Sequence, residues 1–473
     1  MISARTTQGV MELLPAQQLA FGRMLDTIRR GFERFGFLPI ETPVFELTDI
    51  LLTKSGGETE KQVYFVQSTG ALEQGQKPEL ALRFDLTVPL ARYVAQHEHQ
   101  LNFPFRRYQI QRVYRGERAQ KGRYREFYQC DIDVIGKDSL GIRHDAELPA
   151  VIYGIFTQLD IGKFTIYLNN RKLMRGLLEA LGFAEAEHQP VFHEVDRLGK
   201  MERAEIEKRI VDQGIDATKV TRLFDLLALD QADALGALDR IETTSPSFRE
   251  GLDELKTVYA GTLALGVPAS SLAIKLSILR GLDYYTGTVY ETFLDDQPKL
   301  GSICSGGRYD NLAGLYTKSK LPGVGISIGA TRLFSKLLEA CEVLEKRIAE
   351  GLKAKADTAA LEAELAAAER KLHGGRPASI AAAIVLNLDP ALAGECAQIA
   401  TALRTAGLDI EVYGSDDKLG KQMKYADRSG IPFALLYGAT EHAGARVKVK
   451  ELRTGAEHEV PRAELAAWIR AKL

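Results

Sequence analysis

The sequence predicts an α+β fold, in which an antiparallel sheet flanked by helices carries a helical insertion and is followed by a smaller α/β domain. Three observations support this fold. Short runs of alternating polar and apolar residues dominate residues 64–168. A helical stretch rich in Leu, Ala, Glu and Arg fills residues 184–263, after which strand-like runs return. From residue 378 onward, strands alternate with helices.

The amino-acid composition limits the classes of protein to which the chain can belong. The chain has 473 residues, 45% of them hydrophobic, so it can bury a large core and exceeds the usual size of one domain. A formal net charge of -2 excludes a polycation that coats nucleic acid, so any contact with RNA must use local basic patches. The four cysteines form no CxxC pair, and neither a metal site nor a disulfide framework is predicted. Without a leader-like or membrane-spanning apolar run, we expect a cytoplasmic protein that contacts no membrane.

Hydrophobic periodicity divides the chain into five parts. Residues 1–183 and 264–340 are expected to form two halves of one sheet domain, and residues 184–263 the helical insertion between them. Residues 341–377 are rich in alanine with leucines spaced by four, which predicts a helical linker rather than a long coiled coil. Residues 378–473 form the α/β domain. A helix is also expected over residues 17–35, ending at Gly36.

A basic hairpin is predicted near residue 120. Residues 112–126 hold six basic residues and two glutamates between two strand-like runs, and such a loop is most often simply solvated. The next strand indicates a binding site, because the alternation of side chains along a strand places four residues on one face, namely Phe127, Gln129, Asp131 and Asp133. Aspartate is depleted in strands, so this pair indicates binding of a positive group. Arginines at the strand ends would present forked donors to phosphate, as an amino acid bound beside ATP requires.

Other segments give weaker signals. Residues 82–89 would place Arg83, Asp85 and Thr87 on one face of a strand, and an edge strand with these residues outward is the favoured interpretation. Residues 280–291 contain an arginine and two adjacent tyrosines, which could equally be core residues. Residues 323–333 predict a glycine-rich strand entering a helix with Arg332 in its first turn, which favours a phosphate. No P-loop, Rossmann, HExxH or GxSxG motif occurs.

Taken together, these segments resemble the histidyl-tRNA synthetase family of class II aminoacyl-tRNA synthetases over essentially the whole chain. Residues 114–129 resemble motif 2 of the class, residues 323–333 motif 3, and residues 41–46 motif 1, which builds a dimer interface. Residues 280–291 and 305–310 resemble two histidine-specific signatures. The resemblance implies the class II fold, a C-terminal anticodon-binding domain, a homodimer, and ligation of L-histidine to tRNA-His with ATP.

The resemblance also implies a nucleotide site. Arg115 would contact the α-phosphate, and Glu117 and Arg123 would hold ATP. Phe127 would stack on adenine, and Arg332 would clamp the opposite side of the nucleotide. Mg²⁺ would accompany ATP, with no separate metal site on the protein.

The family's histidine-binding positions correspond to Asp85, Thr87, Gln129, Asp133, Arg280, Tyr284 and Tyr285. The first three match positions that receive the α-ammonium group, and Asp133 and the tyrosines match those that read the imidazole. Arg280 matches a catalytic arginine at the carboxylate and the α-phosphate, a role it shares with Arg115. Many bacterial members carry Glu at positions 85 and 133, so the resemblance implies a pocket like the eukaryote-like variant.

The implied chemistry agrees with these residue types. The substrate carboxylate attacks the α-phosphate in line and needs positioning and charge neutralisation rather than a general base. Hydrogen bonds to both ring nitrogens would reject other side chains, because an analogue without them leaves buried polar groups unpaired. In the C-terminal domain, Lys421, Lys424 and Arg428 offer contacts to the tRNA backbone, although a solvated helix face explains them equally well.

Two other functions are compatible with the same fold. A catalytically silent relative that regulates ATP phosphoribosyltransferase predicts loss of the arginines and of the C-terminal domain, whereas Arg115, Arg280 and Arg332 are all present here. An uncharged-tRNA sensor normally lies within a larger kinase chain, and no kinase motif is visible. The sequence therefore favours the enzyme.

Overall fold

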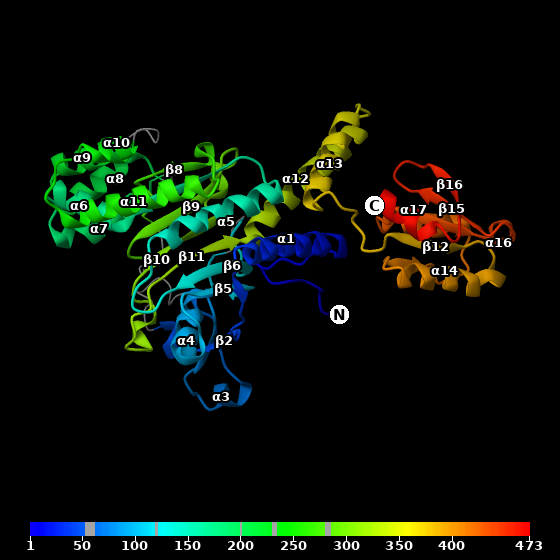
Figure 1. Ribbon diagram of the computed structural model, residues 1–473, viewed down its shortest axis with the longest axis horizontal. Coiled ribbons are helices and arrows are strands. Elements are labelled where there is room, and N and C mark those ends of the chain that lie inside the picture. The colour runs from blue at the N-terminus through cyan, green and yellow to red at the C-terminus, as the bar shows by residue number, and fades with distance from the viewer. Residues whose placement is uncertain (53–61, 119–121, 199–200, 229–233, 280–284) are drawn as a thin grey trace. The chain divides into compact units, whose positions relative to one another are not determined.

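The computed structural model describes residues 1–52, 62–118, 122–198, 201–228, 234–279 and 285–473. The chain forms two compact units (Figure 1). The first comprises residues 1–11 and 25–336, and the second comprises residues 12–24 and 337–473. The domain boundaries expected from the sequence stay a prediction. Within the described ranges, no helix is both long and apolar enough to cross a membrane.

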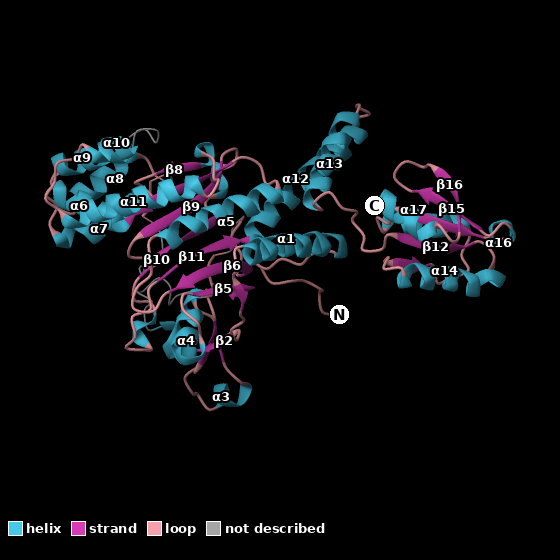
Figure 2. Ribbon diagram, viewed as in Figure 1, coloured by secondary structure: helices cyan, strands magenta, loops and turns pink. Residues whose placement is uncertain are grey.

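A mixed sheet forms the centre of the first unit (Figure 2). Within the described residues its order is β1-β5-β6-β11-β10-β9-β7-β8. The strands are β1 (Leu38–Pro39), β5 (Phe105–Tyr114), β6 (Glu126–Ile135), β7 (Phe164–Asn170), β8 (Leu272–Ile274), β9 (Thr288–Leu294), β10 (Cys304–Tyr309) and β11 (Gly323–Gly329). The predicted antiparallel pairing is confirmed through the centre, and parallel pairs occur only at the two edges of this described sheet, β1 with β5 and β7 with β8.

Two helices near the sheet contact each other through a glycine and an isoleucine side chain. These are α1 (Pro15–Arg34) and α5 (Arg143–Leu159). A Cβ atom at Gly31 of α1 would lie 2.3 Å from Ile155 of α5, so only glycine allows this approach. Phe32 is fully buried, with its ring 6.0 Å from that of Tyr108 on β5. The predicted helix over residues 17–35 is confirmed, and Gly36 follows it with a φ of +76°.

The predicted helical insertion is confirmed and lies at one end of the first unit (Figure 1). Its helices are α7 (Glu185–Val195), α8 (Arg203–Val211), α9 (Ala217–Leu227), α10 (Ala234–Asp239) and α11 (Pro246–Ala264). A preceding helix, α6 (Arg171–Ala180), packs against α11. Two glycines permit this contact, because a Cβ at Gly176 would lie 2.1 Å from the Phe248 nitrogen and one at Gly251 would lie 2.1 Å from the Leu173 nitrogen.

A small second sheet has the strand order β2-β4-β3. Its strands and neighbouring helices are β2 (Phe45–Leu47), β3 (Phe65–Val66), β4 (Leu80–Leu82), α2 (Thr48–Leu52), α3 (Thr69–Glu73) and α4 (Thr87–His97). The strand predicted over residues 82–89 is wrong, because β4 ends at Leu82 and α4 begins at Thr87. Arg83 and Asp85 are buried rather than outward, at 1% and 2% exposure. The Asp85 carboxylate accepts from the Val88 N–H at 3.2 Å, which stabilises the start of α4.

In the second unit, a sheet of order β13-β12-β14-β15-β16 is covered by helices. Its strands are β12 (Ala383–Asn387), β13 (Ile410–Val412), β14 (Phe433–Tyr437), β15 (Arg446–Glu451) and β16 (Glu457–Pro461). Its helices are α14 (Ala393–Thr405), α15 (Leu419–Arg428), α16 (Ala439–Ala443) and α17 (Leu465–Lys472). Helices α14 and α17 pack on one face and α15 on the other, so β12 is an unbroken apolar run. The predicted alternation is confirmed, and an antiparallel hairpin, β15 and β16, extends it.

The alanine-rich linker forms two helices. Helix α12 (Ala330–Lys353) starts directly after β11, and α13 (Ala359–Leu372) follows a short break in which Lys355 has a φ of +55°. The four cysteines are free and buried. Burial raises the pKa of the Cys130 and Cys304 thiols well above the usual value and that of Cys341 to about 11.

A buried ion pair joins β10 to α5. Arg308 donates from Nε to one Asp145 oxygen at 3.1 Å and from Nη2 to the other at 2.6 Å. Both side chains are shielded from water, with 7% and 0% exposure. Arg308 Nη1 also donates to the Leu140 carbonyl at 3.0 Å. Removal of the arginine would leave a carboxylate buried without a counter-charge.

We therefore expect Arg308→Met to lower the free energy of unfolding by about 3–5 kcal/mol. The matched control is Arg30→Ala, which removes an arginine that is 59% exposed and paired with Asp26, and it should cost less than about 1 kcal/mol. Denaturant unfolding followed by circular dichroism measures both. Equal losses in the two variants would contradict this assignment.

Candidate active site

The floor of the candidate site is the shared face of β5 and β6. The antiparallel register pairs Arg107 with Asp133, Gln109 with Asp131, and Gln111 with Gln129. Because side chains alternate along a strand, all of these polar groups lie on the same face as Phe127. The structure thus brings together the four β6 residues predicted to share a face. It adds polar side chains from β5 that sequence reasoning missed.

Asp133 is held from two sides. Arg107, which is fully buried, places Nη2 2.5 Å from one oxygen of Asp133. The Tyr309 hydroxyl donates to the other oxygen at 2.8 Å. Arg107 and Tyr309 were both missed from the sequence. The signal for Arg107 was the alternation of polar residues in residues 107–111, which matches the alternation in β6.

Gly325 provides the space that Asp133 occupies. The register of β11 and β6 sets these two residues opposite each other. A Cβ atom at position 325 would lie 2.1 Å from Asp133 Oδ1. The glycine-rich strand predicted within residues 323–333 therefore approaches a carboxylate of the floor closely. Gly306 repeats the arrangement one strand further, since its Cβ would lie 2.1 Å from the Gly325 carbonyl oxygen.

Three carboxyl groups lie buried close together. Burial raises the pKa of Asp131 to about 7 and those of Asp85 and Asp133 to about 6, and the Arg107 guanidinium partly offsets each shift. Asp85 Oδ2 and Asp131 Oδ1 are buried acceptors without a hydrogen-bond partner in the structure. Unpaired buried acceptors are costly. The cluster is therefore suited to a ligand that brings positive charge and hydrogen-bond donors.

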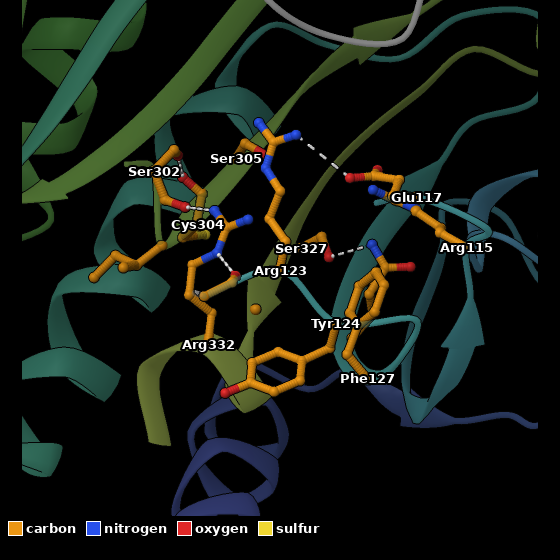
Figure 3. A pocket seen from close by; sticks show the side chains of 14 residues that line it. Arg115, Glu117, Arg123, Tyr124, Phe127, Ser302, Cys304, Ser305, Ser327 and Arg332 are labelled. Carbon is orange, nitrogen blue, oxygen red and sulfur yellow. Dashed lines mark hydrogen bonds and ion pairs between the residues drawn. The ribbon is translucent and has the colours of Figure 1, made fainter. Parts of the chain in front are cut away.

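A pocket of about 160 Å³ opens over the same sheet (Figure 3). It is lined by Arg115, Glu117, Gly122, Arg123, Tyr124, Phe127, Gln129, Ser302, Ile303, Cys304, Ser305, Ser327, Gly329 and Arg332. Every residue assigned to the nucleotide from the sequence is among them, although these residues come from both the hairpin and the start of α12. Ser302, Ser305 and Ser327 were not anticipated.

The hairpin supplies the aromatic and part of the charge. Arg115 donates from Nε to the Phe84 carbonyl at 3.0 Å, and its guanidinium lies 5.1 Å from the centroid of the Phe127 ring. Arg123 Nη1 lies 3.5 Å from a Glu117 oxygen. Figure 3 shows these side chains around the same space. The hairpin thus presents a ring, two cations and one anion to a ligand.

The start of α12 closes the opposite side. Arg332 donates from Nε to the Gly122 carbonyl at 3.0 Å and from Nη1 to the Ser302 carbonyl at 2.8 Å. The neighbouring Thr331 hydroxyl oxygen accepts from the Tyr128 N–H at 2.8 Å. These bonds fix the helix start to the hairpin. A helix N-terminus that carries an arginine favours an anion.

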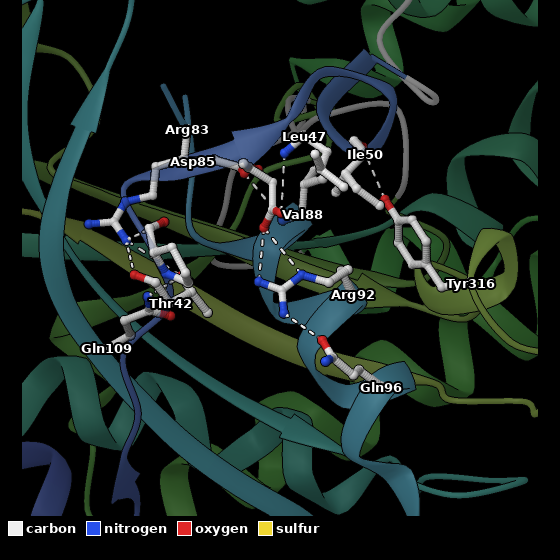
Figure 4. A network of polar contacts seen from close by, with 12 residues as sticks. Thr42, Leu47, Ile50, Arg83, Asp85, Val88, Arg92, Gln96, Gln109 and Tyr316 are labelled. Atoms are coloured by element: carbon white, nitrogen blue, oxygen red, sulfur yellow. Dashed lines mark hydrogen bonds and ion pairs between the residues drawn. The ribbon is translucent and has the colours of Figure 1, made fainter. Parts of the chain in front are cut away.

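Arg83 anchors the segment that carries Asp85 (Figure 4). Its Nη1 donates to the Thr42 carbonyl at 2.6 Å and to the Gln111 side chain at 2.9 Å, and its Nε donates to the main chain of β5. Thr87 is partly exposed at the first position of α4. These bonds to sequence-distant groups explain why the polar alternation of residues 82–89 gives a turn rather than a strand.

The remaining predicted histidine-site residues are only partly described. The ring of Tyr285 packs near Gly307, where a Cβ atom would lie 2.9 Å from Tyr285 Cδ1. The Tyr285 carbonyl accepts from Arg171 at 2.9 Å. Arg280 and Tyr284 lie outside the described residues.

Comparison with known proteins covers both units. Residues 9–333 match the model of the family described as histidyl-tRNA synthetase, and residues 382–472 match that of an anticodon binding domain. The chain is 53% identical to histidine–tRNA ligase of Xanthomonas campestris pv. campestris, over 100% of this chain and 97% of that protein. It is 52% identical to histidine–tRNA ligase of Stenotrophomonas maltophilia, over 100% and 99%.

Solved structures give the same fold. The crystal structure of histidyl-tRNA synthetase from Nostoc sp. PCC 7120 aligns with a TM-score of 0.86 and 37% identity over 100% of both chains. An ATP phosphoribosyltransferase regulatory subunit/histidyl-tRNA synthetase from Bacillus halodurans C aligns with a TM-score of 0.69, over 90% of this chain and 97% of that one. At 18% identity, this second likeness shows the fold alone.

The mixed sheet, with its arginine-lined pocket and separate C-terminal domain, has the architecture of class II aminoacyl-tRNA synthetases. Within that class, the full-length match to close relatives decides the family. The chain belongs to the histidyl-tRNA synthetase family.

The role of Gly325 can be tested through stability. Gly325→Ala forces a methyl group against the Asp133 carboxylate, so we expect a loss of about 1–3 kcal/mol in the free energy of unfolding. Gly154→Ala is the control, because that helical position is open and alanine favours a helix by up to about 1 kcal/mol. Denaturant unfolding compares the two. A Gly325→Ala protein as stable as the parent would show that Asp133 can move away freely.

Proposed function

We propose that this chain is a histidine–tRNA ligase. In the first step, the histidine carboxylate attacks the α-phosphate of ATP, which forms histidyl-adenylate and releases diphosphate. In the second, a hydroxyl at the 3′ end of tRNA-His attacks the adenylate carbonyl, which forms histidyl-tRNA and releases AMP. The observation that carries the proposal is the pocket in which arginines lie beside a floor of buried carboxylates.

The nucleotide would lie between the hairpin and α12. Phe127 would stack on adenine, and Glu117 and Arg123 would hold the rest of the nucleotide. Arg115 would neutralise the α-phosphate as charge develops there, which is the main demand of this reaction, and Arg332 would clamp the opposite side of the nucleotide. Their positions on opposite walls of one pocket support these roles.

Histidine would lie over the floor. The unpartnered buried oxygens of Asp85 and Gln129 suit its α-ammonium group, and Thr87 at the start of α4 would complete that contact. Asp133, held rigidly by Arg107, would read the imidazole together with Tyr285. The family resemblance adds Tyr284 at the ring and Arg280 as the catalytic arginine at the carboxylate. A fixed acceptor suits selection of a ring N–H, because a side chain without it leaves the acceptor unpaired.

Mg²⁺ would accompany ATP rather than reside on the protein. Among the described parts of the chain, no group of three or more His, Cys, Asp or Glu side chains is placed to hold a metal ion. Mg²⁺ commonly binds through substrate phosphates with one or two carboxylates, and Glu117 is available in the pocket. When bound, the ion would neutralise phosphate charge.

The second unit would bind the tRNA. Residues 378–473 are proposed as the anticodon-binding domain, and residues 1–183 with 264–340 as the catalytic domain. Lys421, on α15, is 70% exposed although it pairs with Asp417, so it can contact a tRNA phosphate. Lys424 and Arg428 lie on the same helix. ATP and tRNA as substrates also favour a cytoplasmic location.

We also propose a homodimer. One face of the three-stranded sheet carries exposed apolar side chains from β2 and β4, namely Phe45, Leu47 and Leu80, with exposures of 52%, 49% and 39%. Apolar side chains gathered in this way mark interaction surfaces. The patch adjoins Pro43 in the motif 1 segment, which supports assembly through that region.

The activity can be measured without tRNA. The purified protein should catalyse histidine-dependent exchange of diphosphate into ATP. Arg332→Met should lower kcat/KM by about 10²–10³-fold, because it removes the cation that clamps one side of the nucleotide. Arg34→Ala, at the exposed end of α1 and outside the pocket lining, should leave the rate unchanged. The absence of exchange in a folded, Mg²⁺-supplied sample would refute the proposed function.

Histidine binding should weaken at low pH. Burial raises the pKa of Asp131 to about 7 and those of Asp85 and Asp133 to about 6, and the proposed binding of histidine needs these carboxyls ionised. The KM for histidine should therefore rise as pH falls from about 8 to about 6, while the KM for ATP stays constant. Free histidine itself titrates in this range. The control is therefore an analogue of histidine in which a triazole ring, which stays neutral, replaces the imidazole. If the inhibition constant of this analogue does not change with pH, the prediction is contradicted.

A further inference from the structure

We infer that Ser327 and Asp131 are positioning residues that turn the side-chain amide of Gln129 so that its oxygen faces the amino group of histidine. This inference rests on the proposed function. It adds an arrangement that determines which end of the Gln129 amide faces the amino group of histidine. The two residues would act through Gln129 rather than touch the substrate themselves. We call the chain Gln129–Ser327–Asp131 the relay.

The three side chains are adjacent on the floor. Ser327 of β11 lies opposite Asp131 of β6, and Gln129 precedes Asp131 by two residues on the same face. Gln129 donates from Nε2 to Ser327 Oγ at 3.1 Å, the bond drawn to Ser327 in Figure 3. Because Ser327 and Asp131 are directly paired across β11 and β6, the Ser327 hydroxyl faces the Asp131 carboxyl group, and its interaction with that group lowers the Asp131 pKa. The amide, the hydroxyl and the carboxyl group are thus neighbours in that order.

The chemistry of these groups allows one direction only. An ionised carboxylate can accept but not donate, and a hydroxyl has a single proton. The Ser327 proton is therefore committed to Asp131, and its oxygen can offer only lone pairs to Gln129. The amide must present its NH₂ group to Ser327, which directs Oε1 away from it.

In this orientation the amide oxygen has no hydrogen bond of its own. Gln129 Oε1 is buried and has no hydrogen-bond partner among the described residues, while the residue lines the pocket. An acceptor there attracts an ammonium group, whereas a reversed amide would present N–H donors to it and repel it. The relay thus fixes the orientation of the Gln129 amide, so that Oε1 acts as a hydrogen-bond acceptor.

The surroundings of Asp131 agree with this role. Its oxygen Oδ1 is buried and has no hydrogen-bond partner among the described residues, and the side chain is 2% exposed, so Asp131 lowers the stability of the fold. The charged groups around it are Arg107 from β5, Asp133 from β6, and Arg83 and Asp85 from the segment before α4. Arg107 favours the ionised form of Asp131 on which the relay depends.

A matched pair of variants at position 327 tests the relay. Ser327→Ala removes the hydroxyl, whereas Ser327→Thr keeps it in place. In histidine-dependent ATP–diphosphate exchange, Ser327→Ala should raise the KM for histidine by about tenfold, the loss expected when a hydrogen bond to a charged group is weakened. The KM for ATP should stay within about twofold, and Ser327→Thr should recover most of the loss.

The other end of the relay provides an independent test. Asp131→Asn keeps the shape, but its amide can donate as well as accept, so the direction is no longer enforced. It should raise the KM for histidine similarly, and Ser327→Ala combined with Asp131→Asn should be no worse than Ser327→Ala alone. An analogue of histidine without its amino group should inhibit all variants equally, because Gln129 Oε1 then has nothing to accept.

Several results would overturn the inference. These are an unchanged KM for histidine in both Ser327→Ala and Asp131→Asn, additive effects in the double variant, or weaker inhibition by the analogue without an amino group. A parent protein without histidine-dependent exchange would instead refute the proposed function. Circular dichroism melting identifies any variant that fails to fold. If either Ser327→Ala or Asp131→Asn fails to fold, the other single variant still tests the inference.

Discussion

The antiparallel register between β5 and β6 is the constraint on which the site depends. A slip of one residue would move every polar side chain of this floor to the opposite face. The buried Arg107 opposes such a slip, because it would then lose Asp133 and remain as an uncompensated charge in the interior. The space at Gly325 and the hydroxyl of Tyr309 also favour this register, because both fit Asp133 in its observed position. The register of β5 and β6 therefore determines both the fold and the geometry of the site.

Features set by local pattern could be predicted from the sequence. The basic hairpin, the polar face that begins at Phe127 and the arginine at the start of α12 follow from strand alternation and helix-start signals, and the structure has all three. Arg83 could not be placed in this way, because its partners, such as the Thr42 carbonyl, lie about forty residues away and override the local alternation. Arg107 needed the strand register. Arg280 and Tyr284 stay predictions.

Fold likeness and family membership carry different information here. A solved structure at 18% identity shares the fold and is described as an ATP phosphoribosyltransferase regulatory subunit/histidyl-tRNA synthetase, so the sheet alone does not define an activity. The distinction lies in the site. Arg115 and Arg332 each donate to a main-chain carbonyl, and both line the pocket.

The burial of all four cysteines has a practical consequence for labelling chemistry. Thiols react as thiolates, and burial both hides these sulfur atoms and holds them in the unreactive protonated form. A cysteine introduced at an exposed position, such as Lys424 on α15, would be the fast-reacting thiol of the folded chain without removal of any native cysteine. Fluorescent or spin probes could then report on each unit separately while the core packing stays that of the natural sequence.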